Sequence, residues 1–175
     1  MTGEVGAGGT LMFSNLSAFT KLHVVISLIG ILSGLVVMFG LLVGQKLNRW
    51  TAVFLISTVA TSVTGFFFPF HGPTPAIVVG IISLVLLAVA ILARYSRHLA
   101  GHWRWIYVVC AMISLYLNVF VLVVQLFQKV PALKALAPTQ SEPPFAVTQL
   151  VVLALFVLLT IVAVIKFQGE QLRRA

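Results

Sequence analysis

The stretch from Tyr107 to Gln125 reads YVVCAMISLYLNVFVLVVQ, and it is almost wholly apolar although four polar side chains interrupt it. These are Tyr107, Ser114, Asn118 and Gln125, which follow one another at offsets of seven, four and seven residues. At about 100° per residue, such offsets place all four within roughly 40° of one another on a helix. A polar amide in hydrocarbon costs free energy unless it has a hydrogen-bond partner. This face is therefore predicted to point toward other helices, a ligand or water.

The composition around this stretch is that of an integral membrane protein. Of the 175 residues, 61% are hydrophobic and 8% are charged, whereas a soluble domain carries about 25% charged residues. The chain has no Asp, and its three carboxylates, Glu4, Glu142 and Glu170, lie outside the apolar runs. The mean hydropathy is +1.14. We therefore expect one all-α membrane bundle rather than several domains.

Five apolar runs are long enough to be predicted as transmembrane helices. The first is too long for the core of a signal peptide, and the only charge before it is Glu4, so we expect it to remain in the membrane. Residues 1–20 are expected to be mobile or interfacial, residues 21–167 to form the bundle, and residues 168–175 to form a polar cytoplasmic tail. The predicted spans are 22–43, 51–68, 76–93, 103–127 and 145–165.

The distribution of basic residues predicts the orientation of these five spans. Basic residues concentrate on the cytoplasmic side of membrane proteins, and five spans leave eight of them on one side and three on the other. The prediction is therefore an N-terminus outside and a C-terminus in the cytoplasm. The larger set is Lys46, Arg49, Arg94, Arg97, Arg104, Lys166, Arg173 and Arg174, and the smaller is Lys21, Lys129 and Lys134.

The first span carries two motifs of small residues that are typical of helix packing. Gly30 and Gly34 form one, and Gly40 and Gly44 form the other. Small residues allow another backbone to approach closely, so this face is predicted to pack on a helix. That helix could belong to the same chain, to a second copy in a homo-oligomer, or to a larger membrane complex. The third span is almost purely aliphatic and is expected to be the most lipid-exposed.

Combining helix faces with orientation predicts one polar region in the outer half of the bundle. Polar side chains on four helices and in one turn converge there, and we expect them to bind a ligand. The alternative is that they satisfy one another as interhelical hydrogen bonds, each worth ~0.6–2 kcal/mol. The predicted ligand-binding residues are His23, Thr61, Thr64, His71, Asn118, Gln125 and Gln149.

The histidines and the single cysteine allow few cofactor sites. His23 and His71 lie on the same predicted side, so a b-type heme between them is conceivable, although His71 sits in a Pro- and Gly-rich turn that suits an axial ligand poorly. His98 and His102 are four residues apart, but no acid or cysteine is near them, so no metal site is predicted. Cys110 is expected to be a small buried hydrophobic residue.

The net charge of +8 is interpreted through the membrane rather than through nucleic acid. No basic face on a soluble surface is visible, so no nucleic-acid partner is expected. The most basic loop carries Arg94, Arg97 and Arg104, which are predicted to contact anionic lipid head groups of the bilayer.

No catalytic chemistry is predicted. The spans contain no carboxylate that could act as a base, and no known catalytic motif is present. The leading hypothesis is a small non-enzymatic protein of the inner (plasma) membrane with an outward-facing polar pocket, which binds or passes a small polar or neutral ligand. The alternatives are an accessory or assembly subunit of a larger membrane complex and a small b-type cytochrome. The loop 128–144 is predicted to lie over the outer end of the bundle.

Overall fold

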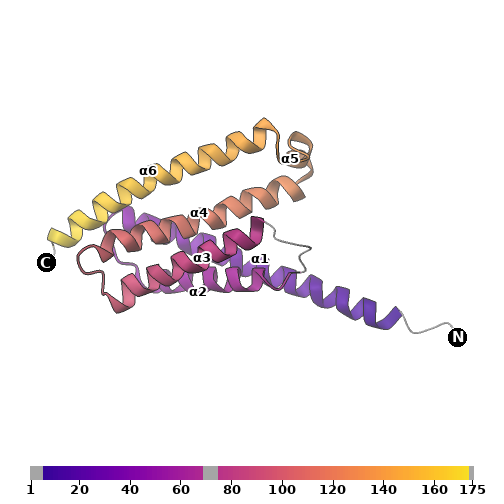
Figure 1. Cartoon of the computed structure of the whole chain (residues 1–175), viewed down its shortest axis with the longest axis horizontal. Coiled ribbons are helices and arrows are strands. Elements are labelled where there is room, and N and C mark those ends of the chain that lie inside the picture. The colour runs from indigo at the N-terminus through magenta and orange to yellow at the C-terminus, as the bar shows by residue number, and fades with distance from the viewer. Residues whose placement is uncertain (1–5, 69–74, 174–175) are drawn as a thin grey trace.

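The computed structural model describes residues 6–68 and 75–173, which form helices joined by short turns. No strand occurs in these two ranges. The long helices are coloured along the chain in Figure 1. In order the elements are α1 (Gly6–Leu42), α2 (Asn48–Gly65), α3 (Pro75–Ile91), the π-helical turn η1 (Leu92–Ser96), α4 (Trp103–Lys129), the short α5 (Pro131–Leu136) and α6 (Pro143–Arg173).

Four of the helices in the described ranges are long and apolar enough to cross a membrane, which suggests a membrane-embedded protein. They contain the segments Ala18–Leu42, Ile77–Ser96, Trp103–Lys129 and Pro143–Gln168. The fifth predicted span, 51–68, corresponds to α2, which is helical over 18 residues but more polar. It begins with an Asn and an Arg and carries several hydroxyl side chains. The predicted count of five spans is therefore not confirmed.

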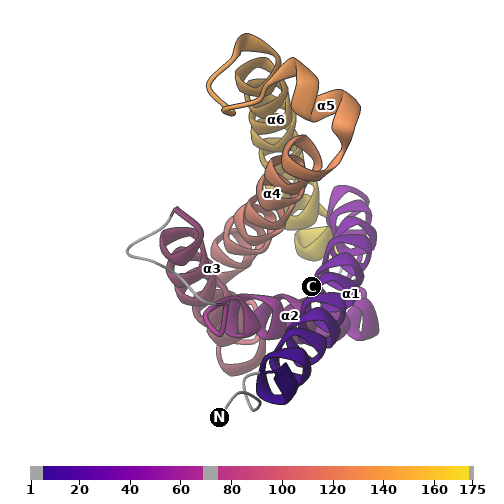
Figure 2. The same cartoon turned by 90° about the vertical axis from the view of Figure 1, so that its right-hand side faces the viewer.

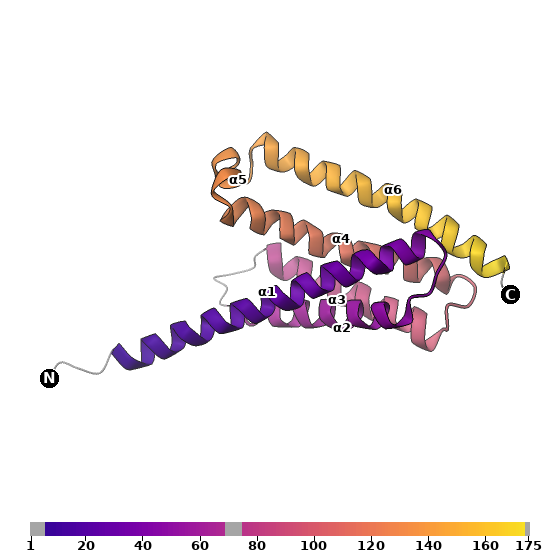
Figure 3. The same cartoon turned by 180° about the vertical axis from the view of Figure 1, so that it is seen from behind.

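The helices α1 to α4 run alongside one another, and α6 lies along α4 (Figures 1 and 3). One end of this bundle holds α5, the end of α2 and the start of α3, and we call it the α5 end. The opposite end holds the α1–α2 turn, η1 and the C-terminal part of α6, and we call it the Arg94 end. The first turns of α1 extend past the α5 end, so the helix begins at Gly6, well before the predicted start of the first span.

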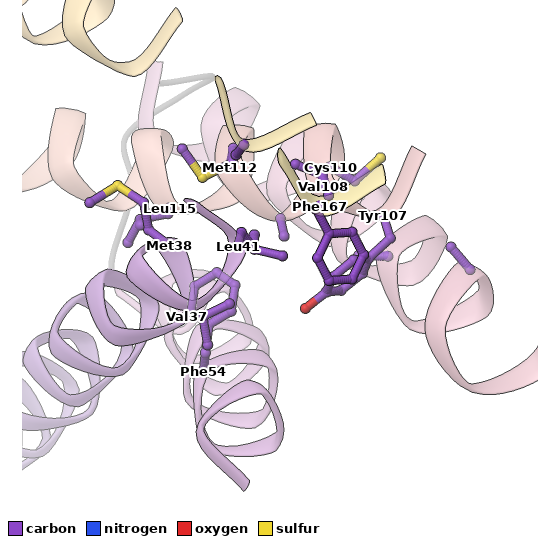
Figure 4. Packing of buried hydrophobic residues seen from close by; sticks show 14 of the residues in the cluster. Val37, Met38, Leu41, Phe54, Tyr107, Val108, Cys110, Met112, Leu115 and Phe167 are labelled. Carbon is purple, nitrogen blue, oxygen red and sulfur yellow. The ribbon is translucent and has the colours of Figure 1, made fainter. Parts of the chain in front are cut away.

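The buried core lies near the Arg94 end, where α1, α2, α4 and α6 meet (Figure 4). Phe54, Leu115 and Met112 are each at most 1% exposed, and Cys110 is buried among apolar neighbours as predicted. The helix least covered by the rest of the protein is α6. Of its most apolar segment 17% is buried, whereas for α3 the buried share is 28%. The expectation that the third span would be the most lipid-exposed is therefore wrong: α6 packs against α4 and α1 along one face and leaves the rest of its surface uncovered.

The glycines of α1 serve two different purposes. A Cβ at Gly34 would lie 2.5 Å from Leu115 Cδ1 and 2.9 Å from the Phe54 ring, so its absence lets α2 and α4 approach closely. The close approach at Gly34 is thus made within one chain, between α1 and the helices α2 and α4. Near the end of the helix, Gly44 has a φ of 71°.

Gly44 ends α1 rather than packing on another helix. Its N–H donates to Leu41 O at 3.2 Å, and the next N–H, of Gln45, donates to Gly40 O at 2.7 Å. This pair of bonds is the Schellman motif, which favours glycine at the left-handed position. A Cβ on Gly40 would meet Leu47 of the same turn at 2.7 Å. The second small-residue motif therefore builds the α1–α2 turn, and its predicted role in helix packing is corrected.

Candidate functional site

A cavity of about 510 Å³ lies at the α5 end, between the outer parts of α1, α2, α3 and α4. Figure 2 looks onto this end and shows the four helices arranged around a common centre. The volume falls within the range of ~300–1,000 Å³ that is usual for small-molecule sites. The polar side chains of the lining are Thr20, His23, Ser27, Thr61, Ser62, Ser83, Asn118, Gln125 and Lys129, and the apolar ones include Val24, Leu28, Ile31, Phe66, Phe68, Val79, Val121, Leu122 and Leu126.

The predicted ligand-binding residues are brought together in part. Four of the seven predicted residues, His23, Thr61, Asn118 and Gln125, line this cavity from α1, α2 and α4. Thr64 lies directly behind them through its bond to His23. The remaining two are not part of this arrangement: His71 falls outside the described residues, and Gln149 lies elsewhere.

His23 is held in one orientation by α2. Its Nδ1 lies 2.8 Å from Thr64 Oγ1, and its ring meets Phe68 edge to face at 5.0 Å. The Thr64 hydroxyl donates its only hydrogen to Ala60 O at 2.7 Å, so it accepts from the Nδ1–H of the imidazole. In the neutral ring Nε2 is then a hydrogen-bond acceptor. His23 therefore offers the lining an acceptor nitrogen whose orientation is fixed by the opposite side of the ring.

Asn118 lies deeper in the cavity, where α4 crosses α1 and α2. Its Nδ2 donates to Thr58 Oγ1 at 3.3 Å and would lie 3.6 Å from a Cβ on Gly30. Gly30 thus makes room for the amide between the helices. The Oδ1 of Asn118 has no partner among the described residues, so the amide keeps an acceptor available beside the cavity.

Two serines that sequence reasoning missed have more spare hydrogen-bonding capacity than several predicted residues. Ser62 on α2 and Ser83 on α3 are only 8% and 3% exposed, and both line the cavity. Neither hydroxyl has a hydrogen-bond partner in the described ranges, whereas Ser27 bonds to the carbonyl of His23. Thr61 Oγ1 is also buried without a partner. Three unsatisfied hydroxyls therefore lie on two helices around one cavity.

These serines carried little signal in the sequence. A lone serine in a membrane helix most often bonds to the carbonyl four residues earlier, as Ser33 and Ser114 do here. Only the side-chain conformations in the structure show that Ser62 and Ser83 do not. Lys129 was used in predicting the orientation, but its place in the lining follows only from where α4 ends.

Gln149 faces a different part of the bundle. Its Nε2 donates to Phe120 O at 3.2 Å, so the side chain joins α6 to the side of α4 opposite the cavity. Its Oε1 is buried and has no partner among the described residues. The predicted depth placed Gln149 near the other polar residues, but its helix face points elsewhere. No residue of 130–144 lines the cavity either, because α5 packs on Val123 and Phe127.

The three arginines predicted to contact lipid head groups differ in their surroundings. Arg94 is 8% exposed, and its guanidinium bonds to Asn48 and lies 5.1 Å from the centre of the Tyr107 ring. It is therefore directed into the protein, and the expectation of lipid contact is corrected for this residue. Arg97 is exposed over Trp103, and Arg104 Nε donates to Leu99 O at 2.9 Å.

The chemistry that this lining can perform is binding. Within residues 6–68 and 75–173 no three His, Cys, Asp or Glu side chains gather as a metal site would require. The lining contains one imidazole, one amine, two amides and several hydroxyls, and it contains no carboxylate. It can therefore hydrogen-bond a ligand over an otherwise apolar wall, and it lacks a carboxylate to act as a base.

Comparison of the chain with protein-family models, with curated proteins and with solved structures found no significant match.

Proposed function

We propose that the protein crosses the membrane five times, with α2 as the second span. The 18 residues of α2 are enough to cross most of a hydrocarbon core at ~1.5 Å per residue. The helix also lies within the bundle, between α1 and α3. Five spans retain the eight-to-three division of basic residues, which favours an α5 end on the outside and a C-terminus in the cytoplasm. The membrane that we propose is the inner (plasma) membrane of the cell.

The function we propose is binding, or passage, of a small polar or neutral ligand by a non-enzymatic membrane protein. The observation that supports it is the cavity at the α5 end, where unpartnered polar groups from different helices line one space. One of these groups, Thr61 Oγ1, is fully buried, and such a hydroxyl costs free energy unless it has a partner. The hydroxyls of Ser62 and Ser83 and the amide of Asn118 line the cavity with hydrogen-bonding capacity to spare, so a ligand in the cavity can bond to them.

A pair of serine variants tests this proposal. Ser83→Ala removes a hydroxyl that has no partner within the described chain, so the free energy of unfolding should change by less than about 0.5 kcal/mol. The matched control, Ser33→Ala, changes a buried serine of α1 that lies outside the lining and bonds to Ile29 O at 2.6 Å. To find a ligand, glycerol, small amides and sugars are each added to the detergent-solubilised protein. A solute that binds the folded protein raises its melting temperature.

We expect Ser83→Ala to lose the stabilisation by that solute and Ser33→Ala to retain it. Asn118→Leu separates a structural role from a binding role for the deepest amide. A stable Asn118→Leu variant that no longer responds to the solute supports the pocket. If it loses stability and still responds, Asn118 only joins helices, and if it keeps both, Asn118 is no part of the site.

The alternative of an accessory subunit is favoured by a different surface. Few residues of α6 are covered, and a second, apolar cavity of about 220 Å³ lies between α4 and α6 beside Tyr116 and Phe156. A partner helix in the membrane could pack there. Isolation of the protein in a mild detergent at native expression level distinguishes the two functions: stoichiometric recovery of a second membrane protein supports the accessory role, and recovery of the chain alone supports the pocket.

A further inference from the structure

The cavity at the α5 end has a chemical asymmetry that restricts the class of ligand. We propose that the ligand is a lipophilic carboxylic acid that enters from the bilayer and pairs its carboxylate with Lys129. This inference rests on the proposed binding function of the cavity and replaces the small polar or neutral ligand by an amphiphilic anion. Three independent features of the lining carry it: one uncompensated positive charge, an apolar wall, and an edge that reaches the lipid-facing surface.

The positive charge belongs to Lys129, at the last residue of α4. Among the described residues it is the only charged side chain in the lining, to which none of them contributes a carboxylate. Glu142, the nearest acid along the described chain, accepts hydrogen bonds from Thr139 and Ser141 in its own loop instead. The ammonium group therefore stands at the entrance of the cavity without a carboxylate partner from the lining. An anionic group on a ligand would supply one.

The remainder of the lining suits an apolar body. Val24 and Leu28 of α1 and Leu122 and Leu126 of α4 all contribute to this apolar part of the lining. Val24, Leu28 and Leu126 are also 41%, 42% and 40% exposed, so the edge of the cavity continues onto the outer surface of the helices. A ligand dissolved in the bilayer can reach the cavity along this edge while its ionised group stays near the membrane surface.

The polar groups at greater depth are compatible with the same class of ligand. Ser62 and Ser83 lie within α2 and α3, whereas Lys129 is the last residue of α4, and neither serine hydroxyl has a partner in the described ranges. They can bond to a hydroxyl or carbonyl carried on the body of the acid. The acceptor Nε2 of His23 can bind a hydroxyl hydrogen nearer the entrance.

The experiment compares decanoate with decanol on the full chain in a non-ionic detergent at pH 8, where the acid is ionised. Binding is measured by equilibrium dialysis of the labelled compounds, for the natural sequence and for two variants. Lys129→Gln removes the charge from the lining. Lys134→Gln is the matched control, because Lys134 is exposed on α5 at the same end but lies outside the lining.

We expect decanoate to bind the natural protein and Lys129→Gln to weaken that binding about fivefold, as the loss of one partly exposed ion pair predicts. Decanol binding should be equal in all three proteins, and Lys134→Gln should bind decanoate as the natural sequence does. The preference for the acid should also decrease as the salt concentration rises.

Equal binding of decanoate to the natural protein and to Lys129→Gln would overturn the assignment of the acid. The binding function would survive that result if decanol or a polar solute still bound in a manner that depends on Ser83. If no acid, alcohol or solute bound, both proposals would fail. Displacement of decanoate by phosphatidylglycerol at lower concentration than by a second fatty acid would assign the charge site to a lipid head group and overturn the free acid.

Discussion

The Nη2 of Arg94 donates a hydrogen bond of 2.7 Å to Asn48 Oδ1, and this pair joins the turn after α3 to the first residue of α2. Arg94 is 8% exposed, and its guanidinium lies 5.1 Å from the centre of the Tyr107 ring and 5.9 Å from that of Tyr95. The charge is thus held by an amide and two aromatic rings, and no ion pair to it is present in the described ranges. Cation–π contacts of this kind strengthen when they are desolvated.

The first prediction follows from this buried charge. Asn48→Ala removes its amide acceptor, and leaving a buried donor without a partner costs about 1–3 kcal/mol. We expect the free energy of unfolding to fall by that amount in a denaturant titration in detergent. Arg94→Met removes the charge itself and retains much of the volume, so adding Asn48→Ala to Arg94→Met should cost less than Asn48→Ala alone. An additive double variant would show that the two side chains do not interact.

A second prediction concerns the close approach at Gly34. Gly34→Ala places a Cβ within 2.5 Å of Leu115 Cδ1 and 2.9 Å of the Phe54 ring. Both neighbours are buried, so the helices must separate, and overpacking of this kind costs about 1–3 kcal/mol. The melting temperature should fall clearly for Gly34→Ala and less for Gly30→Ala, where the nearest atoms are 3.3 Å away. The same loss at both positions would argue against this packing of α1 on α2 and α4.

The residues of this site show what a sequence can predict about a membrane bundle. Helical periodicity places polar side chains on a face, and the polar faces of His23, Asn118 and Gln125 do meet at one cavity. Periodicity does not place the faces relative to one another, however. Gln149 therefore sits at the predicted depth but on the opposite side of α4, where it bonds to Phe120 O.

Because periodicity does not give the arrangement of the helices in space, the surroundings of three other residues could not be predicted. Arg94 lies in a basic loop sequence, and its burial depends on where Asn48 and Tyr107 lie in space. Gly44 belongs to a small-residue motif, yet its left-handed backbone conformation ends the helix. Ser83 is a single hydroxyl in an aliphatic helix, and only the packing of α3 leaves it without a partner.

A third prediction is a pH dependence in the loop before α6. Desolvation acts to raise the pKa of Glu142, but hydrogen bonds from its own backbone N–H, from the backbone and side chain of Thr139 and from the backbone of Ser141 together lower it below its usual value. The pKa is thus lower in the folded than in the unfolded protein, so the stabilisation is present above the unfolded pKa and is lost as the pH falls through the folded one.

Amide hydrogen exchange of residues 139–142 measures this effect. Protection of Thr139 and Ser141, whose backbone nitrogens lie 3.1 Å from the carboxylate oxygens, should decrease as the pH falls below the ordinary range of a Glu carboxyl. Glu142→Gln should show reduced protection at every pH. If protection in the natural protein does not change with pH after correction for the intrinsic exchange rate, the carboxylate does not hold the loop.

A fourth prediction addresses heme. His23 offers one free nitrogen, Nε2, and the second predicted ligand, His71, lies outside the described residues. We expect the protein purified from a heme-sufficient host to have no Soret band in its oxidised or reduced visible spectrum, because the sequence around His71 is rich in proline and glycine, which suits an axial ligand poorly. A sharp Soret band that disappears in both His23→Ala and His71→Ala would establish the b-type cytochrome instead.

The fifth prediction decides whether α2 crosses the membrane. If it does, Gln45 in the α1–α2 turn and Arg97 after η1 lie on the same side, since two spans separate them. If α2 stays at the surface, one span separates the two positions, and they lie on opposite sides. Both side chains are exposed, and the chain has one cysteine, Cys110, which is buried and can be replaced by alanine.

Single cysteines at these positions can be labelled in intact cells with a reagent that does not cross the membrane. With five spans, Gln45→Cys and Arg97→Cys should both be protected until the cells are opened, and Lys134→Cys should react at once. Labelling of Arg97→Cys but not of Gln45→Cys in intact cells would mean four spans. Because the structure places both positions at the Arg94 end, that result would contradict the packing of α2 beside α1 and α3 on which the cavity depends. The eight-to-three division of basic residues would also no longer describe the topology, and the α5 end could not be assigned to the outside on that ground.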